Sequence, residues 1–362
     1  MAENTEASKE KAMKRLLLII NTIILGIGLC GGPLILRLYF LHGGNRVWLS
    51  SFLQTAAFPV LFLPLIISYI IRRRSFSASP NGTKPKPFNM KLPLFLASSL
   101  VGLFLGLDDY LYSYGVARLP VSTSSLLVAT QLAFTAIFAF FMVKQKFTAY
   151  TVNAVFLLCL GSGVLAMHAS GDRPAGESNK QYVMGFVMTS LAAILYGFIL
   201  PLLELVYKKC KQDVTFSLVL EIQLVMCLVA TLFCLVGMII NNDFKVIPRE
   251  ARNFDLGETT YYVVLVAGAL MWQLGFIGSL GVIYCASSLL SGILTAMCVP
   301  ITEVLAVLIY KEKFKAEKGV SLVLALWGFI SYFYGEFKQV KKIQSEPTAE
   351  IDLPQNHSVF DP

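Results

Sequence analysis

Long apolar stretches alternate with short polar segments along almost the whole chain. We place ten such stretches at residues 16–36, 47–71, 92–116, 120–143, 150–167, 183–207, 216–240, 261–284, 288–309 and 319–337. An α-helix rises 1.5 Å per residue and must cross a hydrocarbon core of about 30 Å, so each stretch is close to the required length. The fifth and tenth stretches are near the short limit. The pattern predicts an all-α polytopic membrane protein with ten transmembrane helices.

The composition agrees with this pattern. The chain is 56% hydrophobic and only 14% charged, with a mean hydropathy of +0.67. Soluble domains average about 25% charged residues, so this chain has too little polar surface to remain dissolved in water. We therefore expect the lipid bilayer to be its surroundings.

An internal repeat indicates how the helices are arranged. The segment Asp108–Phe147 returns as Gly278–Phe314, and one gap aligns Gly115 with Gly281 and Lys144 with Lys311. Because each half holds five spans, an odd number, the halves must lie in opposite orientations, as in many alternating-access carriers. The predicted fold is an inverted five-plus-five repeat. Its parts are an N-terminal tail (1–15), a first repeat (16–167), an extracellular linker (168–182), a second repeat (183–337) and a C-terminal tail (338–362).

The distribution of basic residues predicts the orientation. With the N-terminus inside, 18 of the 30 Lys and Arg residues fall on the cytoplasmic side, including Arg72–Arg74 directly after a span. Cytoplasmic loops are richer in Lys and Arg, so both termini are predicted to be cytoplasmic. The cluster from Lys311 to Lys318 is an exception that the inverted repeat explains. Residues 1–15 are polar, and we expect them to lack regular structure.

Carboxylates inside the apolar stretches are candidates for proton coupling or gating. An ionisable group at membrane depth costs roughly 2.5 kcal/mol or more, so each one suggests a function. Asp108 and Asp109 lie in the outer third of the third stretch, and Glu303 lies in the ninth, three residues after Pro300. Glu303 is the first choice as proton carrier. For the two aspartates, an ion pair with Arg118 is as reasonable as a gate.

Two further carboxylates lie near the predicted inner ends of their spans. Glu204 and Glu221 also belong to the proton-coupling or gating candidates. Pairing with Lys208, Lys209 or Lys211 in the headgroup region is an equally good interpretation.

The polar residues at mid-membrane depth are uncharged and suit a nucleobase. Gln131 lies near the centre of the fourth stretch, and Trp272 and Gln273 lie near the centre of the eighth. An amide can donate to and accept from a purine edge, and an indole can stack on the ring. Lipid contact explains a Trp in a span equally well. Thr130, Gln223 and Asn21 complete the substrate-binding candidates, and hydrogen bonds between helices explain any of them.

Several functional classes are disfavoured by what the chain lacks. It shows no paired His, no Cys/His spacing and no nucleophile–base set within its spans, so we expect no metal, no cofactor and no enzyme activity. A receptor would be expected to carry a larger soluble domain. Basic residues are scattered over short loops, which argues against nucleic-acid binding. A carrier of nucleotide-sugars would place Lys or Arg deep in its spans.

Helix-breaking residues show where the spans are expected to be irregular. Pro59 and Pro64 interrupt the second stretch. Gly268, Trp272 and Gly275 share one face of the eighth stretch, which places an aromatic ring beside small residues and leaves room for a flat ligand.

Long motifs give the chain a resemblance to a known family. They read LYSYGVARLPVSTSSLLVATQLAFTAIFAFFMVKQKFT, MWQLGFIGSLGVIYCASSLLS and LWGFISYFYG. Together with the first stretch they resemble the plant purine permeases of the drug/metabolite transporter superfamily, from about Leu16 to Gly335. The resemblance implies a ten-helix carrier that imports adenine, cytokinins and related purines by proton symport. We expect the plasma membrane as its location. Some similar members move alkaloids or vitamin B6 instead. The motifs that resemble the family include the binding candidates Gln131, in Ala-Thr-Gln-Leu-Ala-Phe, and Trp272-Gln273, in Met-Trp-Gln.

Overall fold

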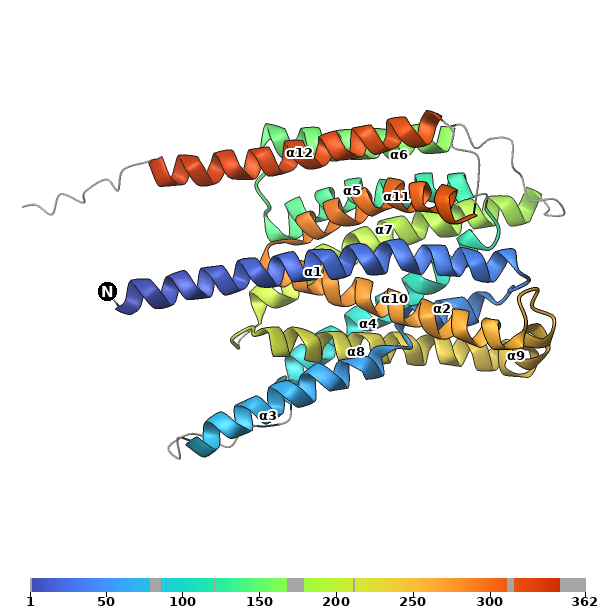
Figure 1. Cartoon of the computed structure of the whole chain (residues 1–362), viewed down its shortest axis with the longest axis horizontal. Helices are drawn as coiled ribbons and strands as arrows, with labels where there is room; N and C mark the ends of the chain where they lie inside the picture. The colour runs from blue at the N-terminus through green and yellow to red at the C-terminus, as the bar shows by residue number, and fades with distance from the viewer. Residues whose placement is uncertain are drawn as a thin grey trace, which may run out of the picture.

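Every regular element in the described part of the chain is helical (Figure 1). The computed structural model describes residues 2–78, 86, 88–119, 121–167, 179–210, 212–310 and 316–345. The elements are α1 (Ala2–Leu41), α2 (Val47–Thr55), a 3-10 turn η1 (Phe58–Leu61), α3 (Phe62–Ala78), α4 (Leu92–Val116), α5 (Val121–Val143), α6 (Ala149–Met167), α7 (Asn179–Lys209), α8 (Phe216–Ile240), α9 (Asp243–Arg252), α10 (Glu258–Cys285), α11 (Ser288–Tyr310) and α12 (Ala316–Ser345).

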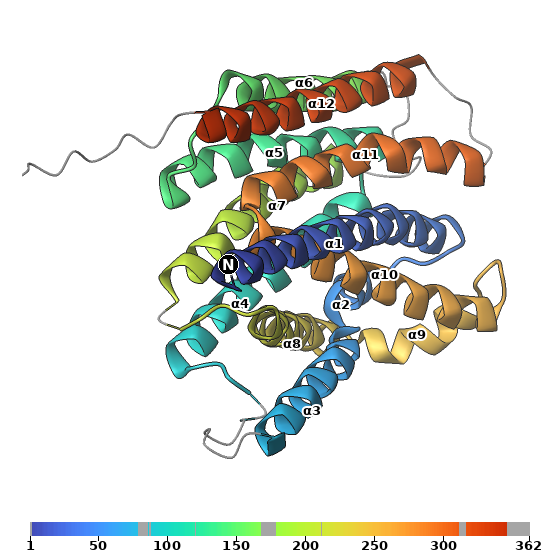
Figure 2. The ribbon, with the colours of Figure 1, turned by 60° about the vertical axis from the view of Figure 1, so that its left-hand side comes forward.

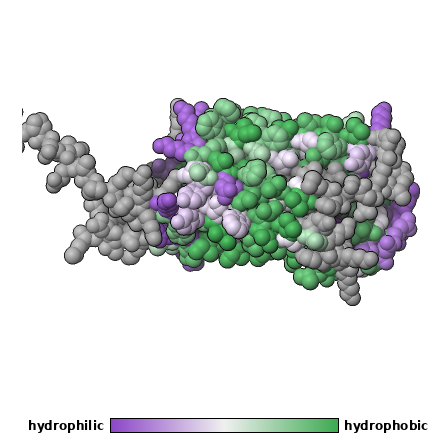
Figure 3. Space-filling view, turned by 90° about the horizontal axis from the view of Figure 1, so that it is seen from above, coloured by the Kyte–Doolittle hydropathy of each residue, from purple (hydrophilic) through white to green (hydrophobic). Residues whose placement is uncertain are grey.

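Each predicted apolar stretch is helical along all or most of its described length, so the all-helical multi-span fold is confirmed. Among the described residues, seven segments are long and apolar enough to cross a membrane, and Val47–Arg74 counts as one of them. Three shorter apolar helices, Thr130–Val143, Ala149–Gly161 and Gly319–Gly335, fall on the remaining predicted stretches. Figure 3 shows a hydrophobic band between more hydrophilic ends. The number of ten spans and the inverted repeat stay predictions.

The second apolar stretch is interrupted, as its prolines predict. Helix α2 ends at Thr55, and Pro59 lies in the 3-10 turn before α3 begins at Phe62. Proline has no N–H to donate to the helix, so a break at this position is expected. Pro64 falls in the first turn of α3, where the missing donor costs little. Beyond the break, α3 leans away from the other helices (Figures 1 and 2).

Two boundaries and one element differ from the sequence-based expectation. The expectation that residues 1–15 lack regular structure is wrong, because α1 begins at Ala2. That segment is rich in Ala, Glu, Lys and Met, which favour helix. Helix α12 likewise continues to Ser345. The short polar helix α9 was not predicted, because its ten residues contain too few apolar positions to be recognised as a span.

The helices pack in pairs that join distant parts of the sequence. The most extensive contacts join α1 to α10, α6 to α12, α5 to α7 and α4 to α8. Figures 1 and 2 both show α6 and α12 side by side along one edge of the bundle. The α1–α10 contact depends on Gly28, because a Cβ atom there would clash with the backbone of Gly275.

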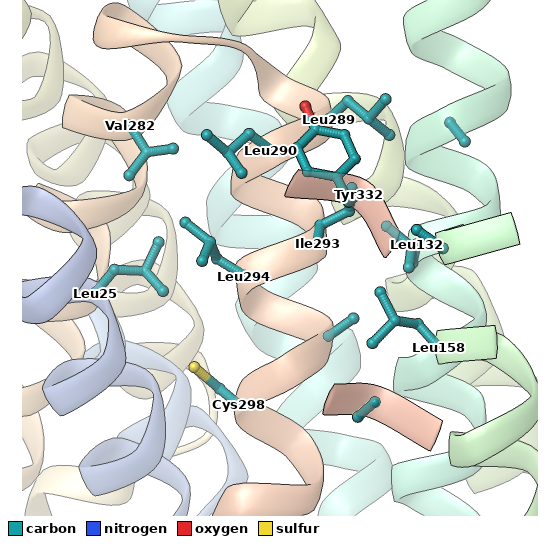
Figure 4. Packing of buried hydrophobic residues seen from close by; sticks show 14 of the residues in the cluster. Leu25, Leu132, Leu158, Val282, Leu289, Leu290, Ile293, Leu294, Cys298 and Tyr332 are labelled. Atoms are coloured by element: carbon teal, nitrogen blue, oxygen red, sulfur yellow. The ribbon is translucent and has the colours of Figure 1, made fainter. Parts of the chain in front are cut away.

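Helix α11 lies at the centre of one hydrophobic core. Ile293 is fully buried, and Leu294 packs in the same cluster as Leu25 of α1 and Leu132 of α5 (Figure 4). A second core joins α4, α7, α8 and α10. Both cores fix the helices around the cavity described next.

Candidate functional site

A cavity of about 500 Å³ lies between α1, α4, α5, α7, α10 and α11. We call the end of the bundle that carries α9 the α9 end, and the opposite end, where α1 begins, the N-terminal end (Figure 1). The cavity wall runs from Leu29 and Gln131, near mid-helix, to Arg37, Leu41 and Val116, near the last turns of α1 and α4. Since α1 and α4 both finish at the α9 end, the cavity occupies that half of the molecule.

Trp272 and Gln131 both lie on the cavity wall. The centroid of the Trp272 ring lies 6.0 Å from that of Tyr112, in an edge-to-face arrangement, and 6.5 Å from that of Phe276. Both neighbours also line the cavity. A Cβ atom on Gly32 would press against the indole from α1. The wall therefore combines an aromatic cluster from α4 and α10 with one amide from α5.

Asp108 and Asp109 also line the cavity, together with Gln131 and Trp272. Their relative exposures are 7% and 1%, and the Oδ1 of Asp108 and the Oδ2 of Asp109 have no hydrogen-bond partner in the described part of the chain. The predicted ion pair with Arg118 is absent from the described contacts. The guanidinium instead lies 3.6 Å from the centroid of the Tyr114 ring. The cavity thus contains two buried carboxyl groups that no cation neutralises among the described ion pairs.

Helix α2 holds this part of α4 in place. The Nε2 of Gln54 donates to the carbonyl of Asp109 at 3.2 Å and to the hydroxyl of Ser113 at 3.0 Å. Gln54 is 3% exposed and also lines the cavity. The backbone that carries the two aspartates is therefore anchored from a second helix.

Glu204 and Glu221 lie away from the cavity and bind other groups. Glu204 pairs with Lys208 at 2.7 Å and accepts a hydrogen bond from the backbone N–H of Ser288 at 2.7 Å. Glu221 accepts from the backbone N–H groups of Asn89 and Met90 at 2.9 and 3.0 Å. The pairing interpretation is confirmed for Glu204 and Lys208, whereas Glu221 satisfies backbone donors just before the start of α4.

The other amides and hydroxyls predicted for binding do not line the cavity. Thr130 donates to the carbonyl of Leu127 at 2.6 Å, and Asn21 donates to that of Leu17 at 2.7 Å. Gln223 and Gln273 are each 1% exposed, and their amide atoms have no hydrogen-bond partner among the described residues. Both amides are buried in the α8–α10 region.

Glu303 belongs to α11, one residue after the cavity-lining Thr302. Its side chain lies outside the described residues, so its part in proton coupling stays a prediction.

The cavity also includes residues that the sequence analysis missed. Thr295, Cys298, Thr302 and Ala306 line it from one face of α11. They recur at intervals of three or four residues, which is the period of a helix face. Small and weakly polar residues at that spacing are the signal that could have identified this wall. Within the described chain, no group of three or more His, Cys, Asp or Glu residues could hold a metal ion.

A multi-pass helical bundle whose mostly apolar cavity carries a few polar side chains in one half of the molecule is the arrangement of a small-molecule membrane carrier. A family profile described as purine nucleobase transmembrane transport matches residues 16–342. The chain is 54% identical to purine permease 3 of Arabidopsis thaliana over 94% of this chain and 97% of that one. It is 53% identical to purine permease 2 of the same plant, over 94% and 98% of the two chains.

The chain therefore belongs to the plant purine permease family, a family of transporters and not of enzymes. The resemblance seen in the sequence motifs is confirmed. A solved structure, the crystal structure of a protein, shares the fold with a TM-score of 0.55 at 13% identity. The match covers 92% of this chain and 98% of the solved one.

Proposed function

We propose that the cavity binds purine nucleobases and their derivatives, adenine and cytokinins among them, for proton-coupled uptake by alternating access. The observation that carries the proposal is that one cavity combines Trp272, Gln131 and the unpartnered Asp108–Asp109 pair. The family's description as purine transporters supports the substrate class.

The cavity offers each interaction that a purine needs. Trp272 and Tyr112 provide aromatic surface for stacking, and Gln131 can both donate to and accept from a base edge. A carboxylate of the aspartate pair can accept from a ring N–H or an exocyclic amine. Ligand pockets span about 300–1,000 Å³. The cavity of about 500 Å³ therefore has space for a purine ring with a further substituent.

The aspartate pair also suits proton coupling. Asp108 and Asp109 are neighbours on one helix, buried and without a cation partner among the described ion pairs. Two adjacent negative charges inside a membrane are costly, so a proton taken up by one carboxyl makes the loaded site easier to carry across. We propose these two residues as proton carriers beside Glu303, and Glu204 and Glu221 as gating residues.

Hydrogen bonds between α7, α10 and α11 join the N-terminal end of the bundle in this conformation. The Ser279 and Ser291 hydroxyls are 2.8 Å apart between α10 and α11, and Glu204 holds Ser288 at the start of α11. Transport requires these contacts to separate while the α9 end closes. With the proposed cytoplasmic termini, the cavity faces the exterior, as uptake across a plasma membrane requires.

Uptake of labelled adenine tests the substrate site. We expect expression in a cell that lacks nucleobase uptake to restore accumulation, and Gln131→Ala to raise KM severalfold. Asn153→Ala is the matched control, because this amide on α6 bonds to Ser331 outside the cavity. An unchanged KM in Gln131→Ala would contradict the placement. Competition by cytokinins, alkaloids and pyridoxine ranks the substrate classes.

Proton coupling is tested separately from binding. A protonophore should abolish accumulation in the parent. Asp108→Asn, Asp109→Asn and Glu303→Gln should each be measured for uphill uptake and for exchange of labelled against unlabelled adenine. The proton carrier is the residue whose variant loses uphill uptake and keeps exchange. Uptake that ignores the protonophore rejects symport and leaves the binding site intact.

A further inference from the structure

Two cysteines from different helices meet at the wall of the cavity. Cys30 of α1 and Cys298 of α11 are 9% and 7% exposed. The Sγ of Cys30 lies 3.9 Å from the carbonyl oxygen of Cys298, and the two thiols also interact with each other. Figure 4 shows the sulfur of Cys298 directed from α11 toward the side where α1 runs. The two residues are separated by 268 positions in the sequence.

Only one member of this pair faces the cavity. Cys298 lines it, beside Thr302, whereas Cys30 is not among the lining residues, and both belong to the core cluster that α1 shares with α11. The two cysteines buried on α8 have different surroundings. Cys234 contacts the carbonyl of Gly106 at 3.8 Å, and neither Cys227 nor Cys234 lines the cavity. A solute inside the cavity can therefore reach Cys298 but not the α8 thiols.

We propose that Cys30 and Cys298 form an oxidisable dithiol, modified by small peroxides that enter the cavity. In the first step the sulfur of one cysteine attacks a peroxide oxygen and becomes a sulfenic acid, releasing one water when the oxidant is hydrogen peroxide. The sulfur of the other cysteine then attacks the sulfenic sulfur, which forms the disulfide and releases a second water. The two thiols lose two electrons, and the peroxide gains them.

A disulfide at this position would join two helices that form the cavity wall. Helix α1 packs most extensively along α10, whereas α11 contacts α1, α5 and α12 to similar extents, so the bond would fix the contact between α1 and α11. Alternating access requires helices that line the cavity to move against each other. The bond would hold the cavity in one conformation, and a reductant would release it. This consequence rests on the proposed transport function, whereas the chemistry of the thiols does not.

Thiol counting on the purified full chain tests the chemistry directly. The chain has seven cysteines, and a maleimide that adds mass reports each free thiol after denaturation. We expect hydrogen peroxide to remove two reactive thiols from the parent and dithiothreitol to restore them. In Cys298→Ser and in Cys30→Ser, disulfide formation should remove no reactive thiol. Cys234→Ser, the matched control, should still lose two.

Several outcomes would overturn the dithiol. They are an unchanged thiol count in the parent, loss of two thiols in Cys298→Ser, or loss of none in Cys234→Ser. Cys298→Ala serves the same purpose if the serine variant does not elute as a single species in size-exclusion chromatography. Excess purine substrate should slow the oxidation of the parent, because Cys298 lines the cavity.

Transport measurements test the consequence. Oxidised parent protein in proteoliposomes should lose most of its adenine exchange and recover it with dithiothreitol. In Cys298→Ser, the adenine exchange of protein treated with peroxide should stay nearly equal to that of reduced protein. Full exchange in a parent that has lost two thiols would reject the locking role. Absence of any adenine transport would reject the proposed function alone, because the thiol count needs no transport.

Discussion

At the scale of single residues, two tryptophans of the chain have opposite surroundings. Trp272 contacts Tyr112 and Phe276 at the cavity, whereas Trp327 of α12 is 65% exposed on the outside of the bundle. Stacking of a base on an aromatic ring contributes about 1–3 kcal/mol, or roughly 5- to 150-fold in affinity. We expect Trp272→Ala to raise the KM for adenine uptake within that range.

Trp327→Ala is the control for this prediction. Its indole lies on the outer face of α12, so adenine KM should stay within twofold of the parent. Equal effects of the two substitutions on KM would mean that Trp272 acts through folding rather than through the purine. Surface expression, measured by labelling, separates changes in the amount of protein from changes in affinity.

Neighbouring residues on a helix show how far the sequence identifies a site. Trp272 and Gln273 were both predicted to bind substrate, but only Trp272 lines the cavity. Successive residues point about 100° apart, so which of the two faces the cavity depends on the helices packed around α10. The sequence places Asp108 and Asp109 away from the binding amides, yet both aspartates share the cavity with Gln131. Depth along a helix cannot be read accurately from sequence.

At the scale of elements, the α1–α10 contact depends on missing side chains. A Cβ atom at Gly28 would clash with the backbone of Gly275, whereas one at Gly26 would meet nothing within 4 Å. Overpacking costs about 1–3 kcal/mol. We expect Gly28→Ala to lower the melting temperature in detergent by several degrees, and Gly26→Ala, the same change one half-turn away, to leave it unchanged.

Equal melting temperatures for the two glycine variants would show that α1 can shift along α10 at little cost. A loss of adenine uptake in Gly28→Ala without a loss of stability would instead indicate that the close contact is needed for movement.

Helix α9 contributes a buried carboxylate, Asp243, to the packing of the α9 end. Asp243 is fully buried, accepts a hydrogen bond from Asn241 at 2.8 Å and lies 3.9 Å from Arg46. Burial raises the pKa of Asp243 above its ordinary value of 3.8, although Asn241 and Arg46 oppose the shift. At pH values just above 3.8, Asp243 is therefore protonated in a larger fraction of folded molecules than of unfolded ones. The contribution of Asp243 to the free energy of unfolding must then fall as the pH rises.

The sign of this effect is measurable with one substitution. Asp243→Asn imitates the protonated side chain, so we expect it to melt at a higher temperature than the parent at pH 7. The difference should shrink as the pH approaches 4. A difference that grows on acidification would mean that the ion pair with Arg46 outweighs the cost of burial.

The positions of the helices could be predicted better than the pairs in which they pack. Hydrophobic length located every long helix, and Pro59 located the break after α2, because both signals act locally. Helix α9 was missed because a short polar helix has neither signal. The pairing of α1 with α10 and of α4 with α8 could not be read from the sequence. It depends on side-chain complementarity between segments far apart in the chain.

At the scale of the whole molecule, the number of crossings decides where the ends of the chain lie. Helix α1 begins, and helix α12 finishes, at the N-terminal end, opposite α9 (Figure 1). Ten crossings place both termini on one side of the membrane. The seven segments that are long enough on their own would place them on opposite sides. The three shorter helices therefore determine the topology.

Single cysteines in a variant without the seven native ones test this topology, provided that the variant still takes up adenine. Lys245→Cys on α9 should react with a membrane-impermeant maleimide on intact cells. Ser8→Cys and Ser345→Cys, near the two ends of the described chain, should react only after permeabilisation. Labelling of one terminus but not the other would reject an even number of spans. Labelling of both termini, with Lys245→Cys protected, would keep ten spans and reverse the orientation. The cavity would then open toward the cytoplasm, and this conformation would be the one that releases an imported purine.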